Sequence, residues 1–123
     1  MPVTLAPSTP WTPYKRISTA DTNAVSVKAS AGVVGVLTAI NTNASPRYLK
    51  LYDLAVAPTV GTDVPTHTFT IPGNTAGAGF ALPLGASGIG FTTGIALALT
   101  TGVADNDAGA VAAGEITVNL GYL

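Results

Sequence analysis

The chain contains no cysteine, so neither a disulfide framework nor a thiolate nucleophile can contribute to its fold or its chemistry. A zinc site with sulfur ligands is excluded for the same reason. There is one histidine, His67, and a single imidazole is too few for a histidine-based metal site. We therefore expect neither a metal ion nor a cofactor.

Charge is scarce, because charged residues make up 9% of the chain against about 25% in an ordinary soluble domain. The formal net charge is −1 and the five basic residues are scattered, so the basic stripe of a nucleic-acid-binding protein is missing. A surface with few charges has little electrostatic repulsion and associates readily. We therefore expect an assembly that covers much of the surface. The alternative is a threonine-rich β surface, because threonine favours strands.

Long apolar runs are absent as well. No run approaches the roughly 18 apolar residues of a spanning helix, so we expect no membrane partner. No segment keeps the 3.6-residue periodicity of an amphipathic helix. Residues 66–71 and 115–122 instead alternate apolar and polar side chains with a period of two, which is typical of half-buried strands.

About eight or nine short strands are indicated, separated by clusters of glycine, proline and asparagine. This pattern predicts an all-β fold, a single antiparallel β-sandwich with a jelly-roll-like arrangement. The segment 33–41 is apolar on both sides, which indicates a central or doubly covered strand. Val34, Val36 and Ile40 are predicted to share one of its faces. The residues predicted to form the core are Phe69, Ile71, Phe80, Leu82, Phe91, Leu97, Val118 and Leu120.

Residues 1–13 are predicted to form an extended, proline-rich arm, and residues 14–123 the β-sandwich domain. Proline fixes φ and removes a hydrogen-bond donor, so this segment suits neither a helix nor a central strand. Trp11 lies in the arm, and it packs either on its own domain or on a neighbour. The prolines of the arm are Pro2, Pro7, Pro10 and Pro13.

No group of residues has the spacing of a catalytic site. His67 alternates with Phe69 and Ile71, which favours a packed or half-buried core residue over a catalytic base, and no nucleophile-elbow motif is present. Asp105 and Asp107 resemble the start of a calcium loop, but the later EF-hand positions carry alanine and isoleucine. We interpret that segment as a polar loop tip. The alternative is a looser cage of oxygen ligands from Asp105, Asp107 and either Asp63 or Glu115. We expect no enzymatic activity.

Tyr48 and Tyr52 share one face of a predicted strand, with Lys50 between them. Such a stripe suits a sugar platform or a protein contact, and burial under another strand is the alternative. Together with Trp11 and Tyr14, these tyrosines are the candidate partner-binding residues.

A set of strand and turn segments comprises residues 18–23, 41–43, 47–53, 72–74, 94–102, 105–107 and 118–120. Together these segments resemble small β-structured virion proteins of tailed bacteriophages and prophages, and the resemblance spans most of residues 15–122. Capsid cement (decoration) proteins and tail or fibre components are the usual roles in that group, and the resemblance implies no enzymatic activity.

The resemblance implies a virion structural protein on the capsid surface, made in the host cytoplasm. We expect a cement protein that stabilises the head by binding the major capsid protein. A homo-oligomer is also expected, a trimer in preference to a dimer, because cement proteins often occupy three-fold positions. The alternative is a tail- or fibre-associated module that binds a host-surface glycan.

Overall fold

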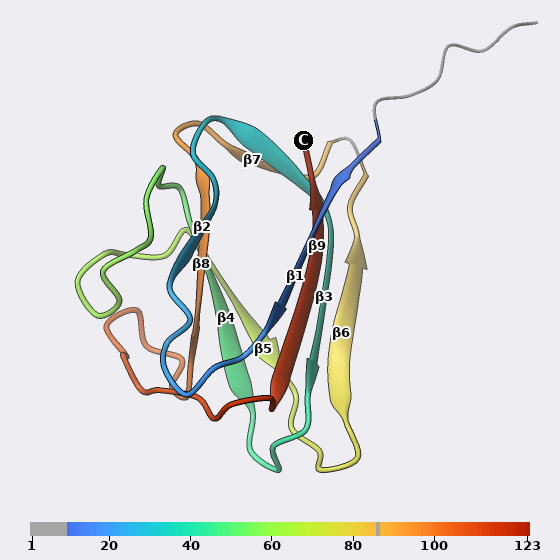
Figure 1. Ribbon diagram of the computed structural model, residues 1–123, viewed down its shortest axis with the longest axis vertical. Coiled ribbons are helices and arrows are strands. Elements are labelled where there is room, and N and C mark those ends of the chain that lie inside the picture. Colours follow the sequence, from blue (N-terminus) through green and yellow to red (C-terminus); the bar gives the residue numbers. More distant parts are fainter. Residues whose placement is uncertain (1–9, 86) are drawn as a thin grey trace, which may run out of the picture.

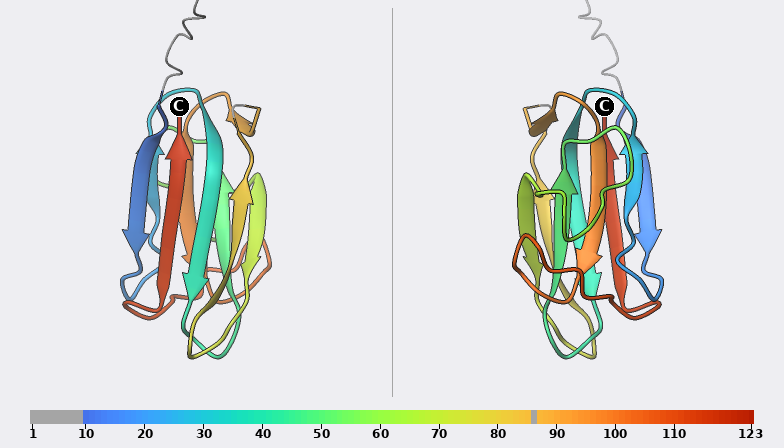
Figure 2. Two further views of the ribbon diagram at one scale, coloured as in Figure 1. Left: turned by 90° about the vertical axis from the view of Figure 1, so that its right-hand side faces the viewer. Right: turned by 90° about the vertical axis from the view of Figure 1, so that its left-hand side faces the viewer.

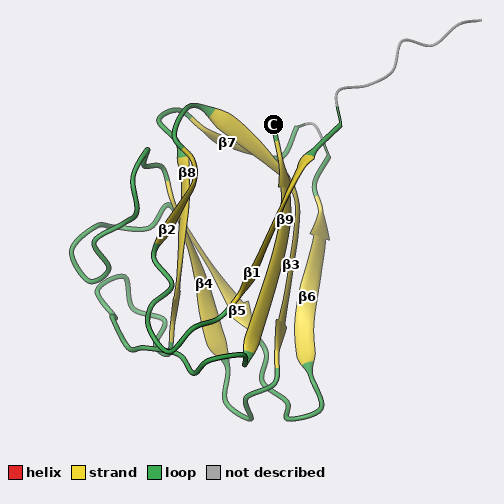
Figure 3. Cartoon of the chain, viewed as in Figure 1, coloured by secondary structure: helices red, strands yellow, loops and turns green. Residues whose placement is uncertain are grey.

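A computed structural model describes residues 10–85 and 87–123, and these residues form nine strands and no helix (Figure 3). The predicted all-β class is therefore confirmed. The strands are β1 (Thr12–Ile17), β2 (Val25–Lys28), β3 (Gly32–Asn41), β4 (Arg47–Tyr52), β5 (His67–Ile71), β6 (Ala78–Pro83), β7 (Ile89–Phe91), β8 (Ile95–Thr100) and β9 (Ile116–Tyr122).

The strands form two antiparallel sheets that face each other, as Figure 1 shows nearly edge-on. The first sheet has the order β1-β9-β3-β6, with β7 paired to the upper part of β3, and the second has the order β2-β8-β4-β5. Four nested antiparallel pairs, β1 with β9, β2 with β8, β3 with β6 and β4 with β5, make one long ribbon. The ribbon is rolled so that β9 also pairs with β3 and β8 with β4, which is the jelly-roll arrangement.

The core lies between the two sheets, and most of the predicted core residues are there. Ile71, Phe91, Leu97, Val118 and Leu120 are buried. The other three predicted core residues pack against this core but are only half-buried, because they lie on β5 and β6, the edge strands that have a neighbour on one side only. These three are Phe69, Phe80 and Leu82.

Strand β3 is central, as predicted, but its predicted grouping of side chains is wrong. The pairing of β3 with β9 shifts between Val34 and Val36, which is the signature of a β-bulge. An extra residue reverses the alternation, so Val34 and Leu37 are both fully buried on the core side. Val36 and Ile40 instead lie on the outer face, where Ile40 is exposed.

The N-terminal boundary differs from the prediction by two residues. Strand β1 begins at Thr12, so Pro13 belongs to the domain and pairs with Gly121 of β9. β1 is an edge strand, where a missing N–H can face away from the ladder, and proline is tolerated there. Residues 1–9 of the predicted arm lie outside the described residues.

Glu115, just before β9, joins three segments of the fold. Its carboxylate accepts hydrogen bonds from Arg47 Nε at 2.8 Å, from Asn43 Nδ2 at 2.8 Å and from the backbone N–H of Ala112 at 2.9 Å. Burial alone would raise the pKa of Glu115, but these hydrogen bonds and the charge of Arg47 outweigh it and lower the pKa. The ionised carboxylate therefore stabilises the folded chain.

Replacement of Glu115 by glutamine should lower the free energy of unfolding by about 2 kcal/mol at pH 7, because hydrogen bonds to a charged acceptor are lost. A group whose pKa is lowered on folding stabilises the fold above its unfolded pKa, and that stability is lost as the pH falls. The difference between the two proteins should therefore shrink at pH 3, as measured by urea unfolding. Asp105→Asn, at an exposed loop carboxylate, is the control that should change little. An equal deficit for Glu115→Gln at both pH values would contradict this account.

Candidate interaction surface

The outer face of the second sheet is covered by the protein's own loops. The loops of residues 53–66 and 101–115 lie across it, as Figures 1 and 2 show. Tyr52, at 0% exposure, forms a small outer cluster with Ala96 and Ala98, and Leu54 and Val60 pack against that cluster. This face is therefore closed to a partner over much of its area.

Lys50 is fully buried beneath the 101–115 loop, although the sequence pattern placed it on an outward strand face. Its ammonium group donates hydrogen bonds to the backbone carbonyl oxygens of Ala104 at 2.5 Å and Asp107 at 3.3 Å. Burial lowers the pKa of Lys50, and the carboxylates of Asp107 and Asp105 oppose that effect. Lys50 therefore holds the loop onto the sheet.

The predicted stripe of Tyr48 and Tyr52 is not an open platform. Tyr52 is fully buried and its hydroxyl makes no hydrogen bond within the described residues, while Tyr48 is half-buried. Burial raises the pKa of the Tyr52 hydroxyl, and the carboxylates of Asp63 and Asp105 add to that effect. The sequence allowed either an exposed platform or burial under another strand. The structure shows burial for Tyr52, which is covered by loops and not by a strand.

Asp107 acts within its own loop. Its Oδ1 accepts hydrogen bonds from the backbone N–H groups of Gly102 at 3.1 Å and Gly109 at 2.9 Å. Asp105 is exposed. Among the described residues there is no cluster of three or more histidine, cysteine, aspartate or glutamate side chains that could hold a metal ion.

Asp53 fixes the start of the other covering loop. Its carboxylate accepts hydrogen bonds from the backbone N–H of Thr93 at 2.8 Å and from the Thr92 hydroxyl at 2.8 Å. The backbone N–H of Thr93 and the Thr92 hydroxyl, with further backbone donors at Gly94 and Thr92, lower the pKa of Asp53 to about 2. The loop of residues 53–66 is thus anchored where it leaves β4.

His67 is exposed, so the prediction of a packed or half-buried core residue is wrong. It pairs with Leu51, which is buried, and so lies on the core-facing side of β5. Its position at the first residue of an edge strand leaves the ring uncovered. The imidazole ring stacks on Phe69, with ring centroids 6.2 Å apart, and lies 6.4 Å from the ring centroid of Phe91.

The outer face of the first sheet differs, because no loop of the described residues lies across its strands (Figure 2, left). The strand registers place small or uncharged residues on it, and Lys15 is the only charged strand residue there. The outward residues are Pro13, Lys15, Ile17, Val36, Thr38, Ile40, Gly79, Ala81, Pro83, Thr117, Asn119 and Gly121. We call this the open face.

Trp11 packs on its own domain, at one end of the open face. Its indole ring lies against Gly35, where an added Cβ would overlap the ring, and beside Gly121, where an added Cβ would come within 3.2 Å of the Trp11 Cβ. A hollow of about 260 Å³ adjoins it, lined by Trp11, Lys15 and Val36 among others. Trp11 remains only half-buried, so part of the indole faces solvent.

Tyr14 lies beside Trp11 but faces mainly the other way. It pairs with Leu120 of β9, which is buried, and its side chain packs against the core between the sheets. The structure therefore brings Trp11 and Tyr14 to one end of the first sheet and keeps Tyr48 and Tyr52 on the second. The four candidate residues do not form one site.

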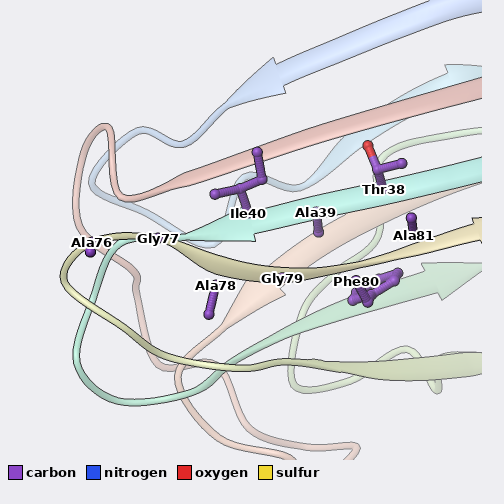
Figure 4. A pocket seen from close by; sticks show the side chains of 9 residues that line it. All are labelled: Thr38, Ala39, Ile40, Ala76, Gly77, Ala78, Gly79, Phe80 and Ala81. Carbon is purple, nitrogen blue, oxygen red and sulfur yellow. The ribbon is translucent and has the colours of Figure 1, made fainter.

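A second hollow of about 630 Å³ lies on the open face between β3 and β6. Figure 4 shows Thr38 and Ile40 projecting from β3 on the side opposite to Ala39 and Phe80. Residues 76–81 form the other wall, and all of them except Phe80 are glycine or alanine. Thr38 lines both hollows, so they adjoin each other across the face. We call this second hollow the β3–β6 hollow.

Acylation of lysines should test the loop cover. We expect a water-soluble acylating reagent to modify Lys15, which is exposed, and Lys28, which is partly exposed, while Lys50 stays protected until the chain is unfolded in urea. Asp107→Ala removes the carboxylate that holds Gly102 and Gly109, so it should speed modification of Lys50, and Asp105→Ala is the matched control. Peptide mass mapping gives the rates. If Lys50 is modified as fast as Lys15 in the native protein, the 101–115 loop does not shield Lys50 and this account is wrong.

Trp11 is the only tryptophan, so its fluorescence reports on its packing alone. Gly35→Ala places a methyl group where the indole ring lies. The emission should shift to longer wavelength and become more sensitive to acrylamide, because water reaches a displaced indole. Thr38→Ala, on the same strand face, is the matched control. Identical spectra for Gly35→Ala and the native protein would show that Trp11 does not rest on Gly35.

No helix formed by the described residues is long and apolar enough to cross a membrane. Comparisons of the chain with protein-family models, with curated proteins and with solved structures gave no match.

Proposed function

We propose that this chain is a structural subunit of a bacteriophage virion, a capsid cement protein that binds the major capsid protein at the head surface and has no enzymatic role. It is made in the host cytoplasm and works as a homo-oligomer, with a trimer favoured. The open face is the observation that carries this proposal. One outer face of the sandwich is closed by loops, whereas the other is broad, nearly uncharged and uncovered by the described residues.

The chemistry of the open face supports contact with protein. Depletion of charge is the mark of an interface core, and a half-buried tryptophan such as Trp11 is the kind of anchor that dominates binding energy. Glycine and alanine on β6 let another surface approach the backbone closely.

The fold is compatible with this role, because jelly rolls occur in viral capsid proteins as well as in lectins. The glycan-binding alternative drew on Tyr48, Tyr52 or the loop of residues 102–114. Tyr52 is fully buried, so the two tyrosines form no exposed platform, and the loop carbonyl groups of Ala104 and Asp107 bind Lys50. We therefore retain the structural role as the proposal.

Light scattering coupled to gel filtration tests the role of the open face. The native chain should have about three times the 12.2 kDa mass of one copy. Thr38→Lys puts a charge at the centre of the open face and should shift the mass towards the monomer. Thr70→Lys is the matched control, because it makes the same change on the outer side of the second sheet and should leave the mass unchanged.

Two outcomes would contradict the proposal. A native chain that is monomeric at micromolar concentration would remove the oligomer. Equal dissociation by Thr38→Lys and Thr70→Lys would show that the open face is not the contact surface.

A further inference from the structure

The open face on its own is small for a stable interface between copies. Four strands about 4.8 Å apart and about six residues long give a footprint of roughly 400 Å². A standard interface buries about 800 Å² on each partner. If copies associate through this face, a further segment of the chain would enlarge the contact.

We propose that the β3–β6 hollow of one copy binds residues 1–9 of a second copy of this chain. This inference rests on the proposed function, because it names a segment that the open face would bind in the proposed homo-oligomer. Its structural basis is the hollow itself, the position of Trp11 and the composition of the nine residues that precede Pro10.

The hollow suits a short uncharged peptide. The hollow has a volume of about 630 Å³ and is widely open to solvent, so an extended segment can lie along it. The wall from β6 is built of glycine and alanine, so backbone is accessible, and Thr38 supplies a hydroxyl that can donate or accept a hydrogen bond. None of the residues that line the hollow is charged.

Residues 1–9 match these requirements in composition and length. The segment Met-Pro-Val-Thr-Leu-Ala-Pro-Ser-Thr has no charged side chain, and Val3 and Leu5 are spaced to lie on the same side of an extended chain. Nine residues of extended strand reach about 30 Å. The stretch of β3 from Gly35 to Ile40 spans only about 17 Å, so the segment is long enough to cross the hollow.

The direction of the chain favours a second copy over the same copy. β1 begins at the Trp11 end of the open face and runs along the sheet, so a segment that precedes Trp11 must reverse to lie on its own hollow. Proline disfavours the α region at the residue before it. By sequence, Pro7 and Pro10 therefore favour extended backbone over a helical reversal at Ala6 and Thr9.

Exchange of the segment between copies also fits a closed assembly. Each copy offers one segment and one hollow, so donation from copy to copy around a ring satisfies every hollow in a trimer. Proline also lowers the conformational entropy that the free segment loses when it docks.

Cysteine cross-linking tests the inference cleanly, because the native chain has no cysteine. Leu5→Cys and Ala81→Cys are made in separate preparations, mixed in equal amounts and oxidised mildly. A disulfide forms only between Cα atoms about 4.4–6.8 Å apart. We expect a cross-linked product of one copy of each variant, with twice the 12.2 kDa mass of a single chain, as the main oxidised species.

The control mixes Leu5→Cys with Thr70→Cys, on the outer side of the second sheet, and should give no such product. A double variant, Leu5→Cys with Ala81→Cys in one chain, separates the two routes. A monomeric internal cross-link in dilute double variant, with no product from the mixed single variants, would show that the segment binds its own copy and would overturn the proposal. No excess over the Thr70→Cys control would also overturn it.

The outcomes keep this inference separate from the proposed function. If light scattering shows an oligomer that Thr38→Lys dissociates but no cross-link forms, the segment exchange is wrong and the assembly role remains. If the cross-link forms but the protein does not reside on the virion head, the exchange stands and the proposed function is wrong.

Discussion

The buried ammonium group of Lys50 decides which side of this sandwich is open. A buried charge is costly unless it is hydrogen-bonded, and here the carbonyl oxygens of Ala104 and Asp107 are its partners. That requirement fixes the 101–115 loop against the second sheet. At the end of the loop, Glu115 ties it to Arg47 and Asn43. The second sheet is therefore closed, and the first sheet keeps the only broad strand surface that the described residues leave uncovered.

Because loops cover one outer face, the scarcity of charged residues in this chain has its main effect on the other outer face. An evenly solvated sandwich would need charged side chains on both outer faces. This one hides the outer face of the second sheet under its own loops and leaves an uncharged surface on the other side, where Lys15 stands alone among the strand residues. Such a surface is stable in water as the core of an interface. The proposed assembly and the proposed segment exchange both follow from that imbalance.

The sequence predicted the fold well and the candidate site poorly, for physical reasons. Period-two alternation located β5, and continuous apolarity marked β3 as central. The alternation rule failed at Val36, because a bulge reverses the alternation. It also failed at Lys50, because alternation shows only which face a residue takes and not whether a loop covers it.

The packing site of Trp11 could have been recognised in the sequence. Gly35 lies within an apolar strand, and glycine there marks a close approach.

Electron microscopy of virions that contain this chain tests the central claim most directly. The account predicts density for the sandwich on the outer surface of the head, in contact with the major capsid protein, with the open face of each copy turned towards a neighbouring subunit. Density in a tail fibre, or a head-bound sandwich whose open face is turned to solvent, would contradict it.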